Sequence, residues 1–282
     1  FANTTRAELK LHWEGASATE LAENFADNDL DFVVPKVDWQ RTSRRILTTS
    51  FVDGIRVDDL DGIANFGLDA TEILERCAKI FFLQVFRDGF FHADMHPGNV
   101  FITNDGSVVP VDFGIMGRLN VTQRRFLARM LTGFIERDYH AVSDVHFDHD
   151  LVGSDQDRNN FLLAMRAVGE PLQGKSLAEI SLAQLLANLF ETTREFSMQT
   201  QPELLLLQKT LFMCEGLGRI IDPNVNMWLL AKPLIAEWIV DNLSPLNRIQ
   251  STLEELQALG LKLPEALDAL ITIAETMKAN KG

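Results

Sequence analysis

The chain has 282 residues, of which 46% are hydrophobic and 23% are charged, so it can bury the core of one large domain or of a lobe with an appendage. Its formal net charge of −14 disfavours a nucleic-acid partner, which needs a basic surface, and gives no general attraction to anionic lipid. The two cysteines, Cys77 and Cys214, lie on helix-like stretches and are expected to be buried thiols rather than a disulfide.

Three elements are predicted before the most informative motifs. Apolar residues at three- and four-residue steps predict a helix over residues 8–25. A β-prone run at residues 46–52 ends at the turn signal Asp53-Gly54. Residues 73–88 carry an apolar stripe typical of a core helix, and Gly89 is well placed to end it.

Two motifs carry the chemistry of the chain. Residues 92–99 read His-Ala-Asp-Met-His-Pro-Gly-Asn, and residues 111–114 read Val-Asp-Phe-Gly. Asn99 stands five positions after Asp94, and Asp112 stands eighteen positions after it. In phosphoryl transfer, one aspartate accepts or orients the proton of the attacking hydroxyl, while an asparagine and a second aspartate hold magnesium ions. We therefore expect a kinase-type site with Asp94 as the base and with Asn99 and Asp112 as metal ligands.

The residues between the two motifs predict a β-hairpin. Residues 100–103 and 108–111 are β-prone, and Asn104-Asp105-Gly106 between them is a strong turn signal. Such a hairpin carries Asn99 at its entry and Asp112 at its exit, so the two metal-binding oxygens end close together.

The first motif also resembles a zinc-ligand cluster, because His92, Asp94 and His96 alternate. No further His or Cys follows within thirty residues, and a zinc site would leave Asn99 and Asp112 unexplained, so the kinase-type site is favoured. His92 is expected to pack inside the lobe, whereas His96 is compatible with a structural or a chemical role.

Little sequence separates the second motif from the next helix. Gly114 is expected to supply backbone freedom after the metal-binding aspartate. Asn120 and Gln123 then form a capping-box pattern at the start of an amphipathic helix. A long peptide-docking segment has almost no room here, which favours a small-molecule or lipid substrate, or ATP hydrolysis coupled to another process.

The remainder of the chain is predicted to be helical, at residues 156–168, 181–190, 202–221 and 227–242. The most apolar stretch, residues 204–221, is interrupted by charged and polar side chains and predicts a buried helix rather than a membrane span. Residues 246–277 also have helical spacing, and they suit either a packing helix pair, which is slightly favoured, or a tether towards a membrane.

The run at residues 90–99 and the run Val-Asp-Phe-Gly-Ile-Met-Gly-Arg-Leu at residues 111–119 resemble the UbiB-like atypical kinases, which support ubiquinone biosynthesis in bacteria and mitochondria. The second histidine and the Pro-Gly before Asn99 distinguish that family from ordinary protein kinases. The resemblance extends over residues 6 to about 245, and includes the stretch Pro-Glu-Leu-Leu-Leu-Leu-Gln-Lys at residues 202–209.

The resemblance implies an α+β, protein-kinase-like fold, consisting mainly of the helical C-terminal lobe. It implies a partial small lobe at residues 1–54, the helical lobe with its catalytic hairpin at residues 55–245, and a helical segment at residues 246–282. It further implies a longer parent protein, whose N-terminal lobe and C-terminal membrane helices extend beyond this sequence.

Further site residues follow from the same resemblance. The strand between the lobes of kinase-like folds binds adenine through main-chain groups, which points to Ser50, Phe51 and Val52 as nucleotide contacts. Glu14 matches a family glutamate that pairs with the phosphate-gripping lysine of the missing lobe, although a solvated helix face is the simpler interpretation. Lys10 stands where the family has an aspartate, and this reversal of charge would change the field near a bound nucleotide.

The function implied is magnesium-dependent binding of ATP, with hydrolysis or phosphoryl transfer that supports ubiquinone biosynthesis. Expected partners are the nucleotide, an isoprenoid quinone precursor or other lipid, and the ubiquinone-biosynthesis proteins of the inner membrane, with the chain on its cytoplasmic face. The alternatives are a small-molecule phosphotransferase of the aminoglycoside or choline kinase type, and an inactive lipid-binding pseudokinase scaffold.

Overall fold

The computed structural model describes residues 10–26, 31–149, 151–172, 181–198, 201–222 and 233–238. The chain divides into two units, residues 1–235 and 236–282, and every labelled element belongs to the first. The domain boundary predicted at residue 245 lies outside the described residues, as does most of the helix predicted at residues 227–242.

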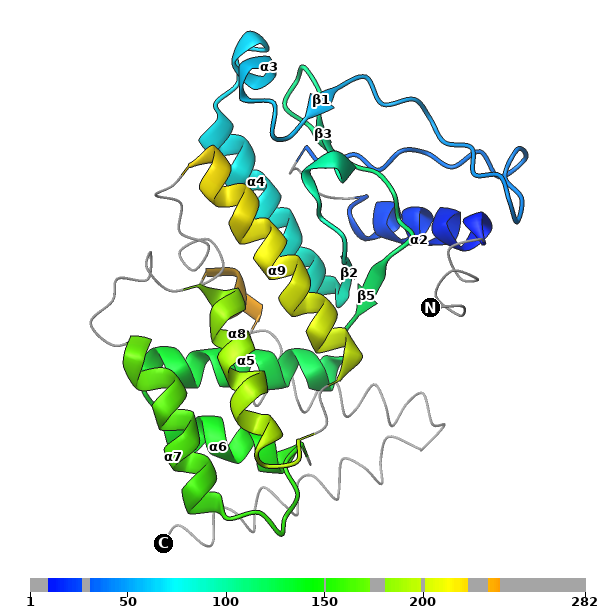
Figure 1. The fold of residues 1–282 in the computed structure, drawn as a ribbon. Helices are drawn as coiled ribbons and strands as arrows, with labels where there is room; N and C mark the ends of the chain where they lie inside the picture. Colours follow the sequence, from blue (N-terminus) through cyan, green and yellow to red (C-terminus); the bar gives the residue numbers. More distant parts are fainter. Residues whose placement is uncertain are drawn as a thin grey trace, which may run out of the picture. The chain divides into compact units, whose positions relative to one another are not determined.

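The elements follow one another in an order that alternates short strands with helices before the chain becomes wholly helical (Figure 1). They are α2 (Leu11–Asn24), β1 (Ile55–Arg56), α3 (Leu60–Asn65), α4 (Ala70–Phe82), the π-helix η1 (Leu83–Asp88), β2 (Phe90–His92), the 3₁₀ helix η2 (Pro97–Asn99), β3 (Val100–Ile102), β4 (Val108–Pro110), β5 (Met116–Arg118), α5 (Val121–Glu136), α6 (Tyr139–Asp148), α7 (Arg158–Gly169), the 3₁₀ helix η3 (Glu170–Leu172), α8 (Leu182–Arg194) and α9 (Pro202–Ile221).

Helix α2 confirms the first predicted element. Gly15, Ala18 and Leu21 form its buried face, as the spacing of the apolar residues predicts. The first residues of the predicted helix lie outside the described part of the chain.

The segment between α2 and β1 is extended but forms isolated bridges instead of a regular strand. Thr49 bridges antiparallel to Val37, and Phe32 bridges parallel to Val108 of β4. The β-prone run at residues 46–52 therefore contributes single backbone pairings and no continuous ladder.

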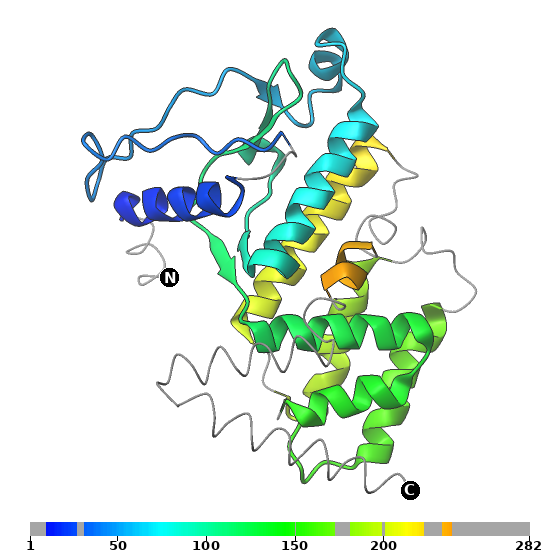
Figure 2. The same ribbon diagram turned by 180° about the vertical axis from the view of Figure 1, so that it is seen from behind.

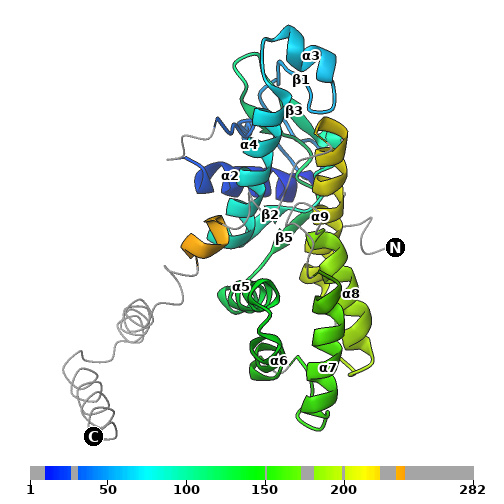
Figure 3. The ribbon, with the colours of Figure 1, turned by 90° about the vertical axis from the view of Figure 1, so that its left-hand side faces the viewer.

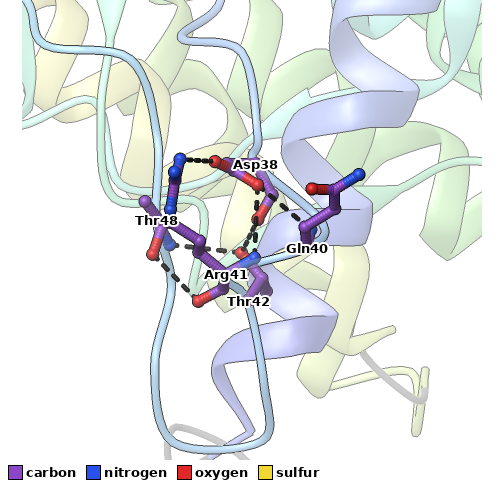
Figure 4. Close-up of polar contacts among 5 residues, drawn as sticks. All are labelled: Asp38, Gln40, Arg41, Thr42 and Thr48. Atoms are coloured by element: carbon purple, nitrogen blue, oxygen red, sulfur yellow. Dashed lines mark hydrogen bonds and ion pairs between the residues drawn. The ribbon is translucent and has the colours of Figure 1, made fainter.

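In this segment, side-chain oxygens accept hydrogen bonds from backbone N–H groups that would pair with a neighbouring strand in a regular sheet (Figure 4). The Asp38 carboxylate accepts hydrogen bonds from the backbone N–H groups of Gln40 at 3.1 Å and Arg41 at 3.2 Å. The Thr48 N–H donates to the Thr42 hydroxyl at 3.2 Å. Short polar side chains compete in this way with strand pairing, which explains the irregular course of the segment.

The predicted hairpin is confirmed. Strands β3 and β4 pair antiparallel, with Val100 opposite Pro110 and Ile102 opposite Val108, and β1 adds to the far side of β3. A second small sheet pairs β2 with β5, so that Phe91 lies opposite Gly117. The two sheets hold the residues on both sides of the second motif.

Helix α4 and its continuation η1 confirm the predicted core helix of residues 73–88. The buried residues include Ile73, Cys77, Ile80 and Phe81, and Gly89 ends the helix with a φ of 64°, which favours glycine. The sequence pattern did not predict that the last turns, from Leu83, are wound as a π-helix.

Helix α9 lies beside α4 along most of its length (Figures 1 and 2). It begins at Pro202, as predicted, where the missing N–H of proline costs no hydrogen bond. The buried side chains of α9 include Leu207, Leu211 and Cys214. Cys214 lines a small apolar cavity with Cys77 of α4 and with Met95, which follows Asp94.

Helices α5 to α8 pack as successive neighbours, and α8 packs in turn against α9 (Figure 3). The predicted capping box at the start of α5 is present. Helix α6 was not predicted, although its buried residues include Tyr139, Val142 and His146, which follow helical spacing. The Asp138 carboxylate starts it by accepting from the N–H of Ala141 at 2.9 Å.

Both cysteines are buried and free, as predicted. Burial raises the pKa of Cys77 to about 12 and also raises the pKa of Cys214, so both remain neutral thiols. Within the described residues, no helix combines the length and the apolar character needed to cross a membrane.

The capping box gives the first prediction. Asn120 accepts from the N–H of Gln123 at 2.8 Å, and the Gln123 side chain accepts from the N–H of Asn120 at 2.9 Å. Replacing Asn120→Ala should lower the free energy of unfolding by about 1 kcal/mol, because a helix N–H loses its acceptor. Denaturant unfolding checks this, with Asn120→Ser as the control that keeps an acceptor. Equal stability of Asn120→Ala and the wild type would contradict the assignment.

A buried histidine gives the second prediction. His146 lies between Phe126 and Phe161, and burial lowers its pKa from 6.5 to about 4. Between these two pH values the unfolded chain binds a proton that the native chain does not, so stability should fall on acidification from pH 6.5 to 4. His146→Phe should remove up to about 3 kcal/mol of this loss.

The measurement is the free energy of unfolding as a function of pH. The matched control is His140→Phe, an exposed position on the same helix. A pH dependence in His146→Phe that equals that of the wild type would rule out His146 as its source.

Candidate functional site

The hairpin brings the two predicted metal ligands together. Beyond the β3–β4 pairing, the N–H of Val111 donates to the carbonyl of Asn99 at 2.8 Å. Asn99 therefore stands at the entry of the hairpin and Asp112 directly beyond its exit, as the sequence predicts.

Asp112 itself adopts a strained backbone conformation. Its φ is 61°, in the left-handed region, which aspartate and asparagine tolerate better than most residues. The carboxylate accepts from the N–H of Gly114 at 3.3 Å, and a Cβ at Gly114 would lie 3.2 Å from the same oxygen. Gly114 was expected to supply backbone freedom at this point, but the positive φ lies at Asp112 and not at Gly114. Gly114 provides close approach, and Asp112 takes the left-handed turn.

Asp94 and Asn99 contact each other directly. The Asn99 carboxamide nitrogen donates to the Asp94 carbonyl at 3.1 Å and to Asp94 Oδ2 at 3.3 Å. These two bonds orient the amide group, so its oxygen faces away from Asp94. An amide oxygen held in this way is a suitable ligand for a hard cation.

His92 connects the two motifs and is structural, as expected. Its ring is fully buried, and Nδ1 accepts from the N–H of Asp94 at 3.2 Å. Nε2 therefore carries the proton and donates to the carbonyl of Val111 at 3.2 Å. Burial lowers the pKa of His92, which keeps the imidazole neutral near pH 7. His96 has a structural contact as well, because its Nδ1 accepts from the N–H of Gly98 at 3.1 Å.

Gln84 is a site residue that the sequence analysis missed. It lies in the π-helical turn η1, is almost fully buried, and accepts from the N–H of His92 at 2.9 Å. A π-turn re-aims the side chains that follow it, and such turns are frequent at functional sites. The available signal was a single amide side chain within the apolar stripe of residues 73–88.

Lys209 of α9 was also missed. Its ammonium group lies 2.8 Å from Asp94 Oδ1, and the two side chains are 50% and 28% exposed. Lys209 ends the stretch of residues 202–209 that resembles the family, but no local pattern links it to Asp94, because the two residues are 115 positions apart.

Glu14 of α2 is brought to the second motif. Its carboxylate accepts from the N–H of Phe113 at 3.2 Å. Partial burial, and then the nearby charge of Asp112, raise the pKa of Glu14, while the Phe113 N–H opposes this rise. Lys10 points elsewhere, since its ammonium group lies 3.5 Å from the centre of the Trp13 ring.

The predicted adenine contacts lie in the extended segment before β1. The N–H of Ser50 donates to the carbonyl of Lys36, and the Ser50 hydroxyl accepts from the N–H of Lys36, both at 2.9 Å. The Phe51 side chain is 91% exposed. Among the described residues, no hydrogen bond or ion pair joins residues 50–52 to Asp94, Asn99 or Asp112, and the role of residues 50–52 as nucleotide contacts stays a prediction.

The donor set at the exit of the hairpin suits a divalent cation with oxygen ligands. Asp112 and Glu14 are close enough for the charge of Asp112 to raise the pKa of Glu14, and Asn99 pairs through its backbone carbonyl with Val111, the residue before Asp112. Magnesium prefers carboxylate and amide oxygens, and a cation here would relieve the repulsion between the two carboxylates.

The chain is similar to known proteins along most of its length. Residues 1–146 match the ABC1 atypical kinase-like domain, and residues 165–226 match the UbiB helical domain. "Probable protein kinase UbiB" of Azotobacter vinelandii is 40% identical over 95% of this chain and 51% of its own length. The protein of the same name from Vibrio vulnificus strain YJ016 is 38% identical over 99% of this chain and 52% of its own length.

The chain thus spans about half the length of the curated relatives it matches. A solved structure, described as the complex of Rv3197 with erythromycin from Mycobacterium tuberculosis, shares the fold. It has a TM-score of 0.51 and 19% identity, and the match covers 82% of this chain and 59% of that one. With more than half of its residues in the matched kinase-like domain and a helical domain after it, the chain has an α+β, protein-kinase-like fold and belongs to the ABC1/UbiB family of atypical kinases.

Proposed function

We propose that the chain carries the phosphate-binding part of an ATP-dependent site that uses magnesium. The observation that supports this most directly is that Asn99 bonds to the Asp94 side chain and also pairs through its backbone with Val111, the residue before Asp112, although Asp94 and Asp112 are eighteen positions apart. An acidic and amide oxygen set beside a candidate base is the arrangement that phosphoryl transfer requires.

Each of these residues has a defined task in the proposal. Asp112 and Asn99 would hold magnesium, which neutralises phosphate charge when it is bound. Asp94 would accept the proton of an attacking hydroxyl or orient a water molecule. His92 stays neutral and keeps the backbone of Asp94 aligned with the strand that leads to Asp112. Ser50, Phe51 and Val52 remain proposed as the contacts with adenine.

A small acceptor, or simple hydrolysis, fits the structure best. Only the six residues 115–120 separate Gly114 from α5, and three of them form β5, which is paired with β2. The segment therefore lacks the length of a peptide-docking platform. Such a short connection is typical of phosphotransferases that act on small molecules, and it also suits an ATPase that needs no acceptor other than water.

We further propose that the protein supports ubiquinone biosynthesis, as the family resemblance implies. Its partners would be a quinone precursor or other lipid and the ubiquinone-biosynthesis proteins at the cytoplasmic face of the bacterial inner membrane. The curated relatives support the kinase family and a bacterial setting.

The first test is a thermal-shift titration of the chain with ATP, with and without magnesium. Magnesium-ATP should raise the melting temperature, because a ligand that binds only the folded state stabilises it. Asp112→Asn should abolish the magnesium-dependent part, because it removes a charged metal ligand yet tolerates the left-handed backbone.

Asp61→Asn is the matched control, since Asp61 is exposed on the distant helix α3. A magnesium-dependent shift of the same size in Asp112→Asn and the wild type would exclude Asp112 as the metal ligand. No shift in the wild type would count against the proposed site.

The second test uses Glu14. Glu14→Gln keeps an oxygen for the Phe113 N–H but removes the charge that Asp112 repels. At pH 7 without metal, this variant should melt slightly higher than the wild type, on the order of 1 °C, because solvent screens the charge of a partly exposed group. Its stabilisation by magnesium-ATP should be smaller than that of the wild type.

The pH dependence has a definite sign. The pKa of Glu14 is raised in the folded chain, so the cost of its charge is present at neutral pH and disappears as pH falls towards 4.5. The advantage of Glu14→Gln should disappear with it. Glu23→Gln, at an exposed position of the same helix, is the control. A lower melting temperature of Glu14→Gln at pH 7 would contradict the repulsion.

A further inference from the structure

Lys209 is a cation beside the proposed base that the two motifs do not account for. The loop of residues 92–99 contains no lysine or arginine, yet the site proposed above must accommodate several phosphate charges. The ammonium group of Lys209 reaches the loop from α9 and lies 2.8 Å from Asp94 Oδ1. The other Asp94 oxygen contacts the Asn99 amide, so the carboxylate is held from two sides.

The backbone of Lys209 is held firmly in place. Leu207, Thr210 and Leu211, the residues around it on α9, are buried. The Thr210 hydroxyl donates to the carbonyl of Leu206 at 2.9 Å, which keeps it within the helix. Helix α9 packs against α4, and Met95 shares a small apolar cavity with residues of both helices. This packing sets the distance between α9 and the loop that carries Asp94.

Stability alone does not account for the ion pair. Lys209 is half exposed and Asp94 is 28% exposed, and pairs of this kind contribute little to folding because water screens them and their side chains lose entropy. An ammonium group has three N–H donors, and Asp94 takes one of them in the structure. The remaining donors of a half-exposed group are available to a ligand.

The distribution of charge around Lys209 indicates the kind of ligand that its free donors would bind. Asp94, Asp112 and Glu14 bring three carboxylates to the site, and Lys10, the cation nearest to Glu14 in sequence, lies on Trp13 instead. Lys209 is therefore a basic side chain that the described structure places directly against this acidic group. In phosphoryl transfer the transferred group lies next to the base and carries negative charge. A positive side chain at this position would therefore stabilise that charge.

We propose that Lys209 binds the terminal phosphate of the nucleotide, so that the site is shared between the two matched domains. Asp94, Asn99 and Asp112 come from the kinase-like domain, whereas Lys209 comes from the UbiB helical domain. In the nucleotide-free chain the ammonium group pairs with Asp94, and with a triphosphate it also contacts the oxygens of the terminal phosphoryl group. This inference rests on the nucleotide site proposed above.

The test compares ATP with ADP, because only ATP has the phosphate that Lys209 would contact. Apparent dissociation constants of the chain are measured in magnesium by thermal-shift or calorimetric titration, with a non-hydrolysable ATP analogue to prevent turnover. The wild type should bind the triphosphate more tightly than ADP. Lys209→Met should weaken triphosphate binding about tenfold and leave ADP binding within twofold of the wild type, because a charged hydrogen bond is lost at one phosphate only.

Two variants separate the position of the charge from its presence. Lys209→Arg keeps a cation and should retain most of the preference for the triphosphate. Lys79→Met removes one positive charge from an exposed position of α4 and should bind both nucleotides like the wild type. Melting temperatures without ligand show whether each variant is folded.

The outcomes distinguish the inference from the function on which it rests. A preference for triphosphate that Lys209→Met retains, or equal binding of both nucleotides by the wild type, overturns the role of Lys209 and leaves the nucleotide site intact. Absence of magnesium-dependent binding of either nucleotide by the wild type overturns both. Loss of ADP binding together with ATP binding in Lys209→Met would also overturn the inference, because the effect would not be specific to the terminal phosphate.

Discussion

The site depends on one neutral imidazole. His92 accepts from the N–H of Asp94 and donates to the carbonyl of Val111, so a single ring links the loop of the proposed base to the end of the hairpin that precedes the proposed metal ligand Asp112. This works only while one nitrogen carries a proton and the other does not, because a charged ring would offer two donors to one acceptor and one N–H. Burial keeps the ring neutral, and Gln84 holds the backbone of the same residue.

Near this ring lie the carboxylates of Asp112 and Glu14, whose mutual repulsion destabilises the folded chain. Asp112 sits in a left-handed conformation, and Glu14 is drawn towards it from α2. Both arrangements oppose stability, and proteins retain such features where a ligand compensates for them. The same residues would stabilise a bound cation. The repulsion that destabilises the chain without a ligand would therefore also be the source of the affinity for the cation.

Local signals in the sequence predicted the parts of the structure that are local. The hairpin, the capping box of α5 and the glycine at the end of η1 each follow from a few adjacent residues, and all three are present. The π-turn that carries Gln84 and the approach of Lys209 to Asp94 depend on packing between elements far apart in the sequence, which no short pattern encodes. Helix α6 was missed because a buried histidine and serine occupy part of its inward face, so its spacing is less evident from the apolar residues alone.

The pairing of β2 with β5 has a consequence for how the protein can be regulated. Asp112 is anchored before it by the hairpin and after it by the bond from the N–H of Ala93 to the carbonyl of Ile115, which leads into β5. Swinging the aspartate out of the site would break backbone hydrogen bonds on both sides. A rearrangement that flips this segment would therefore have to open one of these two pairings first.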